Sequence, residues 1–276
     1  MVDLLENIYG STVQHGPHNN RVYVLRLAAD RTGVLLPQLE QLAKTNGYGK
    51  IFAKIPSTSR QQFLSAGYIK EADIPLFYSG KTACCFVSKF FFDRQRTDED
   101  FTNLLRIIKH GKTEIKGNAG SIPQFPVELC TTADAEELSI FYRNLFESYP
   151  FPVFDAVYLH QTMRQNVQYY CIREEKKIVA AAAIESNEAD KYAEMTDFAT
   201  IPSWRGKGLA ACLLRHMDQV ACSSGILTAF TIARATSYGM NRVFQNCGYT
   251  YSGLLINNTQ IGGSIQSMTV WYRHYV

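Results

Sequence analysis

The sequence lacks the patterns that mark membrane, secreted and nucleic-acid-binding proteins. None of its apolar runs is long enough to cross a bilayer, and its start, MVDLLENIYG, does not join a basic region to an apolar stretch as a secretory signal does. It has no run of Lys and Arg and no basic–aromatic stripe, and its net charge is only +3 over 276 residues. We therefore expect a cytoplasmic protein with neither a membrane nor a nucleic-acid partner.

Metal-binding and disulfide patterns are also missing. The seven cysteines are an odd set without a C-x-x-C pair, and the six histidines show neither H-x-H nor H-x-x-x-H spacing. Most cysteines lie among apolar residues, so we interpret them as reduced core residues, including the adjacent pair Cys84 and Cys85. We predict no metal site.

The chain contains enough apolar sequence for one large or two ordinary domains, since 46% of its 276 residues are hydrophobic and 19% are charged. The spacing of apolar residues predicts one order of elements twice. The first copy has a helix at 34–44, a strand at 50–55, a helix at 57–66 and the pair Gly67-Tyr68, and the second has a helix at 209–222, a strand at 227–232, a helix at 236–246 and the pair Gly248-Tyr249.

This repetition predicts an α/β (α+β) fold in which a mixed sheet flanked by helices follows a degenerate N-terminal α/β unit of similar order. We place the N-terminal unit at 1–116, a linker rich in Gly and Pro at 117–126, and the second unit at 127–276. The first twenty residues are polar, so the first strand is predicted only at 21–28, and a helix is predicted at 98–110.

The most informative stretch is 196–217, where a strand, a glycine-bearing turn and a helix follow one another without a gap. Pro202 removes a backbone donor and ends the strand, while Gly206 and Gly208 tolerate the positive φ angles of a tight turn. The helix that starts at Leu209 directs its unpaired N–H groups and positive dipole end toward the same turn. We predict that this turn binds a pyrophosphate group.

Three phosphate-binding loops compete for this turn. A nucleotide P-loop requires G-x-x-x-x-G-K-[ST], but the two glycines are too close together and Leu209 stands in place of Ser or Thr. A dinucleotide fingerprint is imitated loosely, but the next predicted strand offers no acid for the ribose. The pattern R-x-x-G-x-A fits at Arg205, Gly208 and Ala210, and an ordinary turn with a solvated Arg and Lys is the alternative.

The R-x-x-G-x-A pattern after a strand and a proline resembles the acetyl-CoA loop of the GCN5-related N-acetyltransferase (GNAT) superfamily, and the order of predicted elements after residue 127 is similar too. The resemblance implies an acetyltransferase-type mixed sheet, acetyl-CoA as co-substrate and a small-molecule amine as acceptor, and it leaves a homodimer open. It implies coenzyme contacts from Phe198, Ala199, Thr200, Arg205, Gly206, Lys207, Gly208, Leu209, Ala210, Ser237 and Asn241. For Ser237 and Asn241 an ordinary helix-cap and surface role is the alternative.

Several longer runs narrow the resemblance. The runs SYPFP, AEMTDFAT, RGKGLA, GMN, NNT and SMTVWY resemble the β-lysine N-acetyltransferases, which make Nε-acetyl-β-lysine as a compatible solute. The specific motifs cover residues 125–276 and imply β-lysine as the acceptor. Another small amine, such as lysine, a polyamine or an aminoglycoside, is an alternative substrate, and a coenzyme A-binding sensor without turnover is an alternative function.

Amine acetylation requires a base, because an amine with a pKa of about 10.4 is protonated at neutral pH. Regular alternation places Glu194 on one strand face with Thr196, Phe198 and Thr200, and Asp197 on the other, whereas a bulge would bring both acids to one side. We assign the base to Glu194 and the anchor for the second ammonium of the substrate to Asp197. A solvent-facing acid is the alternative for Glu194.

Other groups are expected around the substrate. The prolines of the 147–152 loop predict a rigid segment in which Tyr149 and Phe151 wall a cleft, although a surface connector is the alternative. Asn257, Asn258 or a tyrosine of that loop is expected to donate a hydrogen bond to the substrate carboxylate.

The chain departs from the superfamily at the general acid. The tyrosine that protonates the leaving thiolate in the superfamily corresponds to Phe244 here. Nearby phenols are Tyr238, Tyr249 and Tyr251, and the sequence does not rank them.

Overall fold

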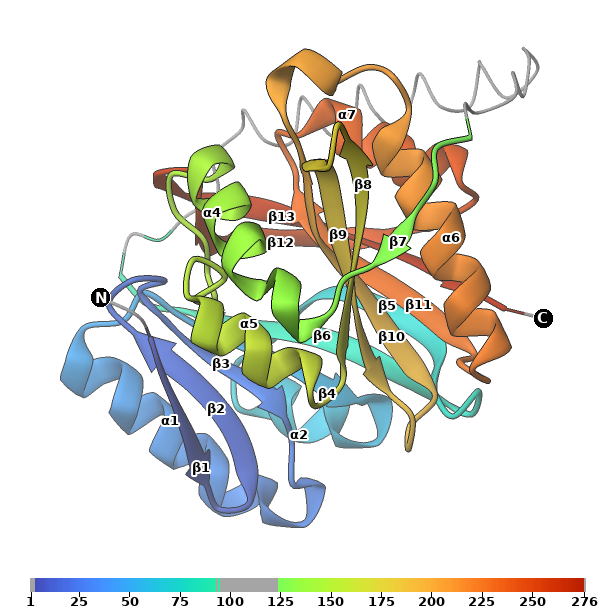
Figure 1. Ribbon diagram of the computed structural model, residues 1–276. Helices are drawn as coiled ribbons and strands as arrows, with labels where there is room; N and C mark the ends of the chain where they lie inside the picture. Colours follow the sequence, from blue (N-terminus) through green and yellow to red (C-terminus); the bar gives the residue numbers. More distant parts are fainter. Residues whose placement is uncertain (1–2, 93, 95–123, 276) are drawn as a thin grey trace.

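The computed structural model describes residues 3–92, 94 and 124–275, and contains two mixed sheets with helices on their faces (Figure 1). The C-terminal sheet has the strand order β12-β13-β11-β10-β9-β8-β7. Its strands are β7 (Glu128–Leu129), β8 (Val167–Glu174), β9 (Lys177–Asn187), β10 (Tyr192–Thr200), β11 (Thr228–Arg234), β12 (Thr250–Ile261) and β13 (Ser264–His274), and its helices are α4 (Ala135–Leu145), α5 (Ala156–Met163), α6 (Leu209–Ser223) and α7 (Tyr238–Asn246).

Helices cover both faces of this sheet (Figure 1). Alternate residues of β9 point to opposite sides: Ala180, Ala182 and Ile184 join the core under α6 and α7, whereas Ala181 and Ala183 join the core under α4 and α5. The expected mixed sheet flanked by helices is therefore confirmed.

The N-terminal sheet has the order β1-β2-β3-β4-β6-β5. Its strands are β1 (Leu4–Ile8), β2 (Ser11–Gly16), β3 (Arg21–Arg26), β4 (Lys50–Pro56), β5 (Ile69–Tyr78) and β6 (Thr82–Phe90), with helices α1 (Thr32–Asn46) and α2 (Arg60–Ser65). The order β2-β3-β4-β6-β5 in this sheet corresponds to β9-β10-β11-β13-β12 in the C-terminal sheet. In both sheets the strand before the long helix runs parallel to the strand after it. The structure thus repeats the order that the sequence predicts.

The hairpin of β1 and β2 is a correction, because the polar first twenty residues led us to expect no strand before residue 21. The second strand, β2, buries polar side chains, so its sequence lacks the alternation of apolar and polar residues that predicts a strand. Gln14 and His15 find partners far along the chain, in the carbonyl of Pro150 and the hydroxyl of Tyr48. Pairing that depends on such distant residues cannot be read from a local pattern.

Other boundaries agree with the predictions within a few residues. The predicted helix at 57–66 begins as a 3-10 turn (Ser57–Ser59), and three further 3-10 turns are Ala29–Arg31, Thr132–Asp134 and Pro202–Trp204. The predicted helix at 98–110 and most of the linker at 117–126 lie outside the described residues. Within the described ranges, no helix is both long and apolar enough to cross a membrane.

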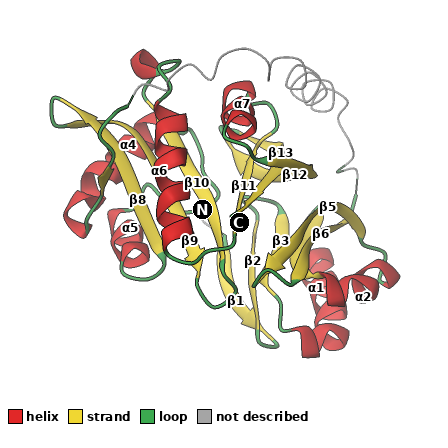
Figure 2. Ribbon diagram, turned by 90° about the vertical axis from the view of Figure 1, so that its right-hand side faces the viewer, coloured by secondary structure: helices red, strands yellow, loops and turns green. Residues whose placement is uncertain are grey.

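The two sheets pack against each other through a shared core. On β4, Ile51, Ala53 and Ile55 face α1 and α2, whereas Phe52 faces the C-terminal sheet in a cluster with Phe230 of β11. Figure 2 shows the resulting order of layers, with α1 and α2 on the outer side of the N-terminal sheet. The N-terminal unit therefore lies directly against the strands that carry the predicted site.

Two features fasten this packing. At Gly253 of β12, an added Cβ would lie 2.7 Å from the Cβ of Ala72 on β5, so only glycine permits the approach. The buried ammonium of Lys50 donates to the carboxylate of Glu71 at 2.8 Å and to the carbonyl of Ile256 on β12 at 2.7 Å. A buried charge with an ion partner and a second acceptor is strongly stabilised relative to an unpaired one.

Candidate active site

The site is built where two parallel strands part. β10 and β11 pair only from Tyr192 to Glu194 and from Thr228 to Phe230, although β10 continues to Thr200. Beyond the paired segment, each strand has backbone that its neighbour does not use. The structure thus opens the sheet immediately before the predicted phosphate turn.

A bulge in β10 re-aims its side chains. The register with β9 shifts between Thr196 and Ala199, and Asp197 has a φ of 56°. Met195 and Phe198 both reach the core under α6, so the two residues between them lie on the side of Glu194. The expected regular alternation is wrong for Phe198, and the bulge alternative, which unites the two acids, is confirmed.

The turn between β10 and α6 has the predicted backbone. Gly206 and Gly208 have φ angles of 79° and 86°, and Gly208 directly precedes the first residue of α6. Glycine is the residue that adopts this region without strain. The Arg205 guanidinium donates through Nε to the carbonyl of Thr200 at 3.1 Å, which ties the turn to the end of β10.

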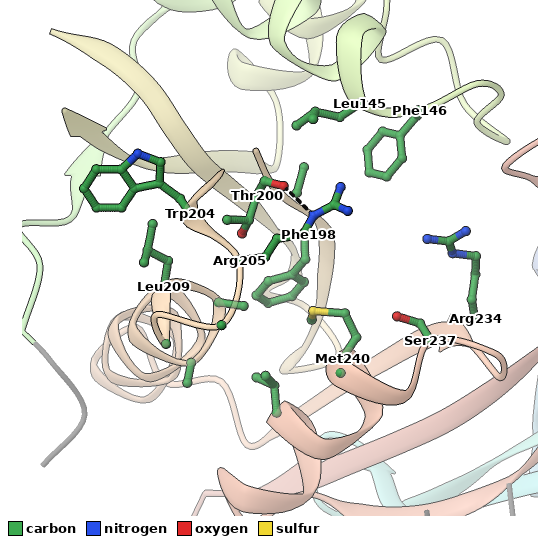
Figure 3. A pocket seen from close by; sticks show the side chains of 17 residues that line it. Leu145, Phe146, Phe198, Thr200, Trp204, Arg205, Leu209, Arg234, Ser237 and Met240 are labelled. Atoms are coloured by element: carbon green, nitrogen blue, oxygen red, sulfur yellow. Dashed lines mark hydrogen bonds between the residues drawn. The ribbon is translucent and has the colours of Figure 1, made fainter. Parts of the chain in front are cut away.

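A cavity of about 490 Å³ lies beside this turn (Figure 3). Its lining unites most of the predicted coenzyme residues: Phe198, Ala199, Thr200, Arg205, Gly206, Gly208, Leu209, Ala210 and Ser237. They come from β10, the turn, α6 and the start of α7. Residues that the sequence analysis missed also line it, among them Leu145, Phe146, Trp204, Arg234 and Met240. Arg234 is the last residue of β11 and lies three positions before Ser237. A basic residue so close to a predicted coenzyme contact is a signal that could have identified it.

Lys207 and Asn241 differ from the other predicted coenzyme residues. The Lys207 ammonium lies 4.0 Å from the ring centroid of Trp204, in a cation–π contact. Asn241 is fully buried, donates to the carbonyls of Arg234 and Ser237, and accepts from the hydroxyl of Thr269 and the indole of Trp271. Its amide has no donor or acceptor left for a ligand, so we correct its role from coenzyme contact to positioning of the turn that carries Ser237.

Asp197 and Glu194 lie on the face of the sheet opposite α6, which α4, α5 and the N-terminal sheet cover, and Asp197 raises the pKa of Glu194. The Tyr149 hydroxyl donates to Asp197 Oδ1 at 2.6 Å, and the Thr196 hydroxyl donates to the same oxygen at 3.1 Å. Burial raises the pKa of Asp197 to about 6, and these two hydrogen bonds oppose the rise. Burial raises the pKa of Glu194 to about 8, although the nearby Lys54 ammonium lowers it.

The loop that carries Tyr149 is held by the N-terminal unit. His18 Nε2 lies 3.2 Å from the carbonyl of Tyr149, and Gln14 Nε2 donates to the carbonyl of Pro150 at 3.3 Å. The Phe146 ring, which lines the cavity, packs on Tyr149 with ring centroids 4.8 Å apart. Phe151, two residues on, is partly buried. A continuous set of contacts therefore runs from the cavity through Phe146 and Tyr149 to Asp197.

Asn257 and Asn258 lie where β12 meets the N-terminal unit. The Asn257 carbonyl accepts from Arg94 Nε at 2.9 Å, and the Asn258 carbonyl accepts from Arg21, while the Asn258 side chain is buried. Both thus have an interface role.

The cation that lowers the pKa of Glu194 is Lys54 of β4, which the sequence analysis did not single out.

Comparison with known proteins identifies the family. Residues 135–249 match the model of the Acetyltransferase (GNAT) family. Over 267 residues, the chain is 34% identical to Beta-lysine N(6)-acetyltransferase of Methanococcus maripaludis, with 96% of this chain and 97% of that protein covered. The chain belongs to the GNAT acetyltransferase family. The expected acetyl-CoA-dependent N-acetyltransferase class is thereby confirmed.

Two further relatives extend this finding. This GNAT chain is 33% identical to N-acetyltransferase YodP of Bacillus subtilis, with 95% of this chain and 94% of that protein covered. It is 30% identical to Beta-lysine N(6)-acetyltransferase of Methanosarcina mazei, with 85% of this chain and 94% of that protein covered. These relatives therefore match the N-terminal unit as well as the GNAT-like unit.

In this GNAT acetyltransferase, Phe244 stands where the resemblance implied a tyrosine. Phe244 is buried between Phe198 and Tyr249, with ring centroids 5.6 Å and 5.7 Å away. The Tyr249 hydroxyl donates to Asp218 at 2.7 Å in the core, which removes it from the three substitutes. Tyr238 is 52% exposed and Tyr251 packs edge-on against Trp271.

Proposed function

We propose that this enzyme transfers the acetyl group of acetyl-CoA to the side-chain amine of β-lysine. The observation that supports it most is the glycine turn with its cavity where β10 and β11 part: Asp197 directly precedes the lining residue Phe198, and Glu194 ends the paired segment of the same strand. The relatives that carry the name Beta-lysine N(6)-acetyltransferase cover almost the whole chain, which favours the same acceptor.

The residues of the cavity fit the coenzyme. Two glycines with positive φ and the first turn of α6 offer backbone N–H groups to a pyrophosphate, which is the group that a helix N-terminus favours. Phe198, Ala199 and Thr200 line the cavity from the end of β10 that pairs with β9 but not with β11, where backbone groups on the open edge would hold the pantetheine arm. Bound acetyl-CoA supplies a thioester carbonyl as the target of the amine.

Glu194 is assigned as the base that removes the proton from the attacking ammonium. An ordinary glutamate is a weak base toward an amine with a pKa of about 10.4. Burial raises the pKa of Glu194 from 4.5 to about 8, which narrows the mismatch by on the order of 5 kcal/mol. A base whose pKa lies close to the working pH combines adequate strength with a useful ionised fraction.

Asp197 is assigned as the anchor of the ammonium that is not acetylated. Its pKa of about 6 keeps it ionised at neutral pH, and the hydrogen bonds from Tyr149 and Thr196 fix its orientation. One acid thus binds while the other accepts the proton. Phe151 is proposed to wall the substrate cleft, and Asn257 or Asn258 is proposed to donate a hydrogen bond to the substrate carboxylate.

A panel of amines tests the proposal. We expect kcat/KM for β-lysine to exceed the values for lysine, a polyamine and an aminoglycoside by at least about tenfold, because lysine places its second ammonium one carbon away and the other two lack the carboxylate. A polyamine or aminoglycoside as the best substrate would assign the enzyme to another acceptor.

A further inference from the structure

Lys54 is a cation that the N-terminal unit presents to Glu194. It lies two residues after Phe52 on β4, and therefore on the face of the N-terminal sheet that packs against the C-terminal sheet. Its Nζ atom lies 5.0 Å from the ring centroid of Tyr192 and 5.2 Å from that of Phe230. These rings belong to the short paired segment of β10 and β11 in which Phe230 is opposite Glu194.

Burial lowers the pKa of Lys54, but the nearby Tyr192, Tyr23 and Glu194 raise it by more, so its ammonium stays charged although it has no direct ion partner among the residues that the structure describes. Lys50 has the Glu71 carboxylate at 2.8 Å, and Arg21 donates to Asn258 and Thr259. Lys54 is partly buried, yet within the described part of the chain no carboxylate lies within 4.0 Å of its Nζ. Aromatic faces offset only part of the cost of removing an ammonium from water.

The proposed substrate carries a group that can pair directly with this ammonium. At neutral pH, β-lysine has two ammonium groups and one carboxylate. Glu194 and Asp197 alone would suit a polyamine equally well, because two acids complement two ammonium groups and nothing selects a carboxylate. A cation beside the acids adds the third complementary charge.

We propose that Lys54 binds the carboxylate of the amino-acid substrate and so makes the site select an amino acid over a polyamine. This inference rests on the proposed function. It assigns a specificity-determining residue to the N-terminal unit, whose sheet also holds the Tyr149 loop through Gln14 and His18. The substrate site is then shared by both units, with the acids on one and the cation on the other.

The alternative is that Lys54 acts only through Glu194, by keeping its pKa from rising further. The two roles give different kinetics. Loss of a carboxylate anchor raises KM only for substrates that have a carboxylate, whereas loss of a tuning charge shifts the pH profile for every substrate.

The test compares Lys54→Met and Lys54→Arg with the wild type, using β-lysine and β-lysine amide, in which a neutral carboxamide replaces the carboxylate. We expect Lys54→Met to raise KM for β-lysine by on the order of 10- to 100-fold, the range for losing a charge-assisted hydrogen bond, and to leave KM for the amide within about twofold. Lys54→Arg should restore part of the discrimination. Lys44→Met, at an exposed lysine of α1, is the control and should behave as the wild type.

Equal changes for both substrates in Lys54→Met, with unchanged thermal unfolding and acetyl-CoA affinity, would overturn the inference. A shifted pH profile with the β-lysine preference intact would assign Lys54 to Glu194 alone. Wild-type enzyme that acetylates a polyamine but not β-lysine would instead refute the proposed function, and with it any carboxylate anchor.

Discussion

Replacing Glu194 by Gln removes the carboxylate and keeps the shape of the side chain. If Glu194 takes the proton from the attacking ammonium, kcat should fall by on the order of 10²–10⁴-fold, which is the usual contribution of a general base. The effect on KM should be small, because Asp197 still holds the other ammonium.

The pH profile gives the sharper test. Because burial raises the pKa of Glu194 to about 8, only about one molecule in ten has the ionised base at pH 7. Wild-type kcat should therefore rise nearly tenfold per pH unit up to about pH 7, rise roughly fivefold more by pH 8, and level off above it. In Glu194→Gln this limb should vanish, and the residual rate should climb toward the amine pKa of about 10.4 as free amine accumulates.

The same pKa makes a stability prediction. In the folded state Glu194 holds its proton up to about pH 8, whereas in the unfolded chain it loses the proton near 4.5, so the folded state is favoured at low pH and loses this advantage as pH rises through 8. Urea denaturation should show Glu194→Gln gaining stability relative to the wild type between pH 5 and 9.

Steady-state rates of thiol release from pH 6 to 9.5 test the assignment of Glu194 as the base. Glu188→Gln, at an exposed acid near the same strand, is the control. If Glu194→Gln keeps wild-type kcat across pH 7 to 9, the base is elsewhere and the assignment is wrong.

Three further outcomes concern Asp197, the glycine turn and the corresponding turn of the N-terminal unit. Asp197→Asn should mainly raise KM for the amine, by on the order of tenfold or more, with kcat little changed, and a fall in kcat alone would give Asp197 a different role. Gly208→Val should weaken acetyl-CoA binding in calorimetry, since it places a side chain in the predicted phosphate turn and strains a residue with a φ of 86°. Gly225→Val, at a φ of 78° after α6, carries similar strain and should leave the acetyl-CoA affinity unchanged. Calorimetry should also give one acetyl-CoA per chain, because the turn before α1 has no glycine with positive φ, and a stoichiometry of two would contradict this.

The sequence predicts best what local residues decide. The phosphate turn follows from a proline, two glycines and the helical spacing after Leu209, all within a few positions, and the structure gives both glycines positive φ. The repeated order of elements is likewise a sum of local patterns. Both predictions agree with the structure because the backbone freedom of glycine and the helical spacing of apolar residues do not depend on distant partners.

The acid site was predicted only in part, because its geometry depends on distant contacts. The bulge in β10 is fixed by pairing with β9, so the sequence left the relative faces of Glu194 and Asp197 open. Tyr149 reaches Asp197 across 48 positions, and Lys54 comes from the other sheet. Asn241 matched a coenzyme position by its place in the chain, but Thr269 and Trp271 occupy its acceptor.

The proposed function requires turnover where β10 and β11 part. The most direct test incubates the wild-type enzyme with acetyl-CoA and β-lysine, and follows free thiol together with the mass of the product. One thiol should be released for each acetyl group added to the side-chain amine. Tight acetyl-CoA binding without thiol release, for β-lysine and for every other amine tried, would contradict the proposed function and indicate a coenzyme sensor.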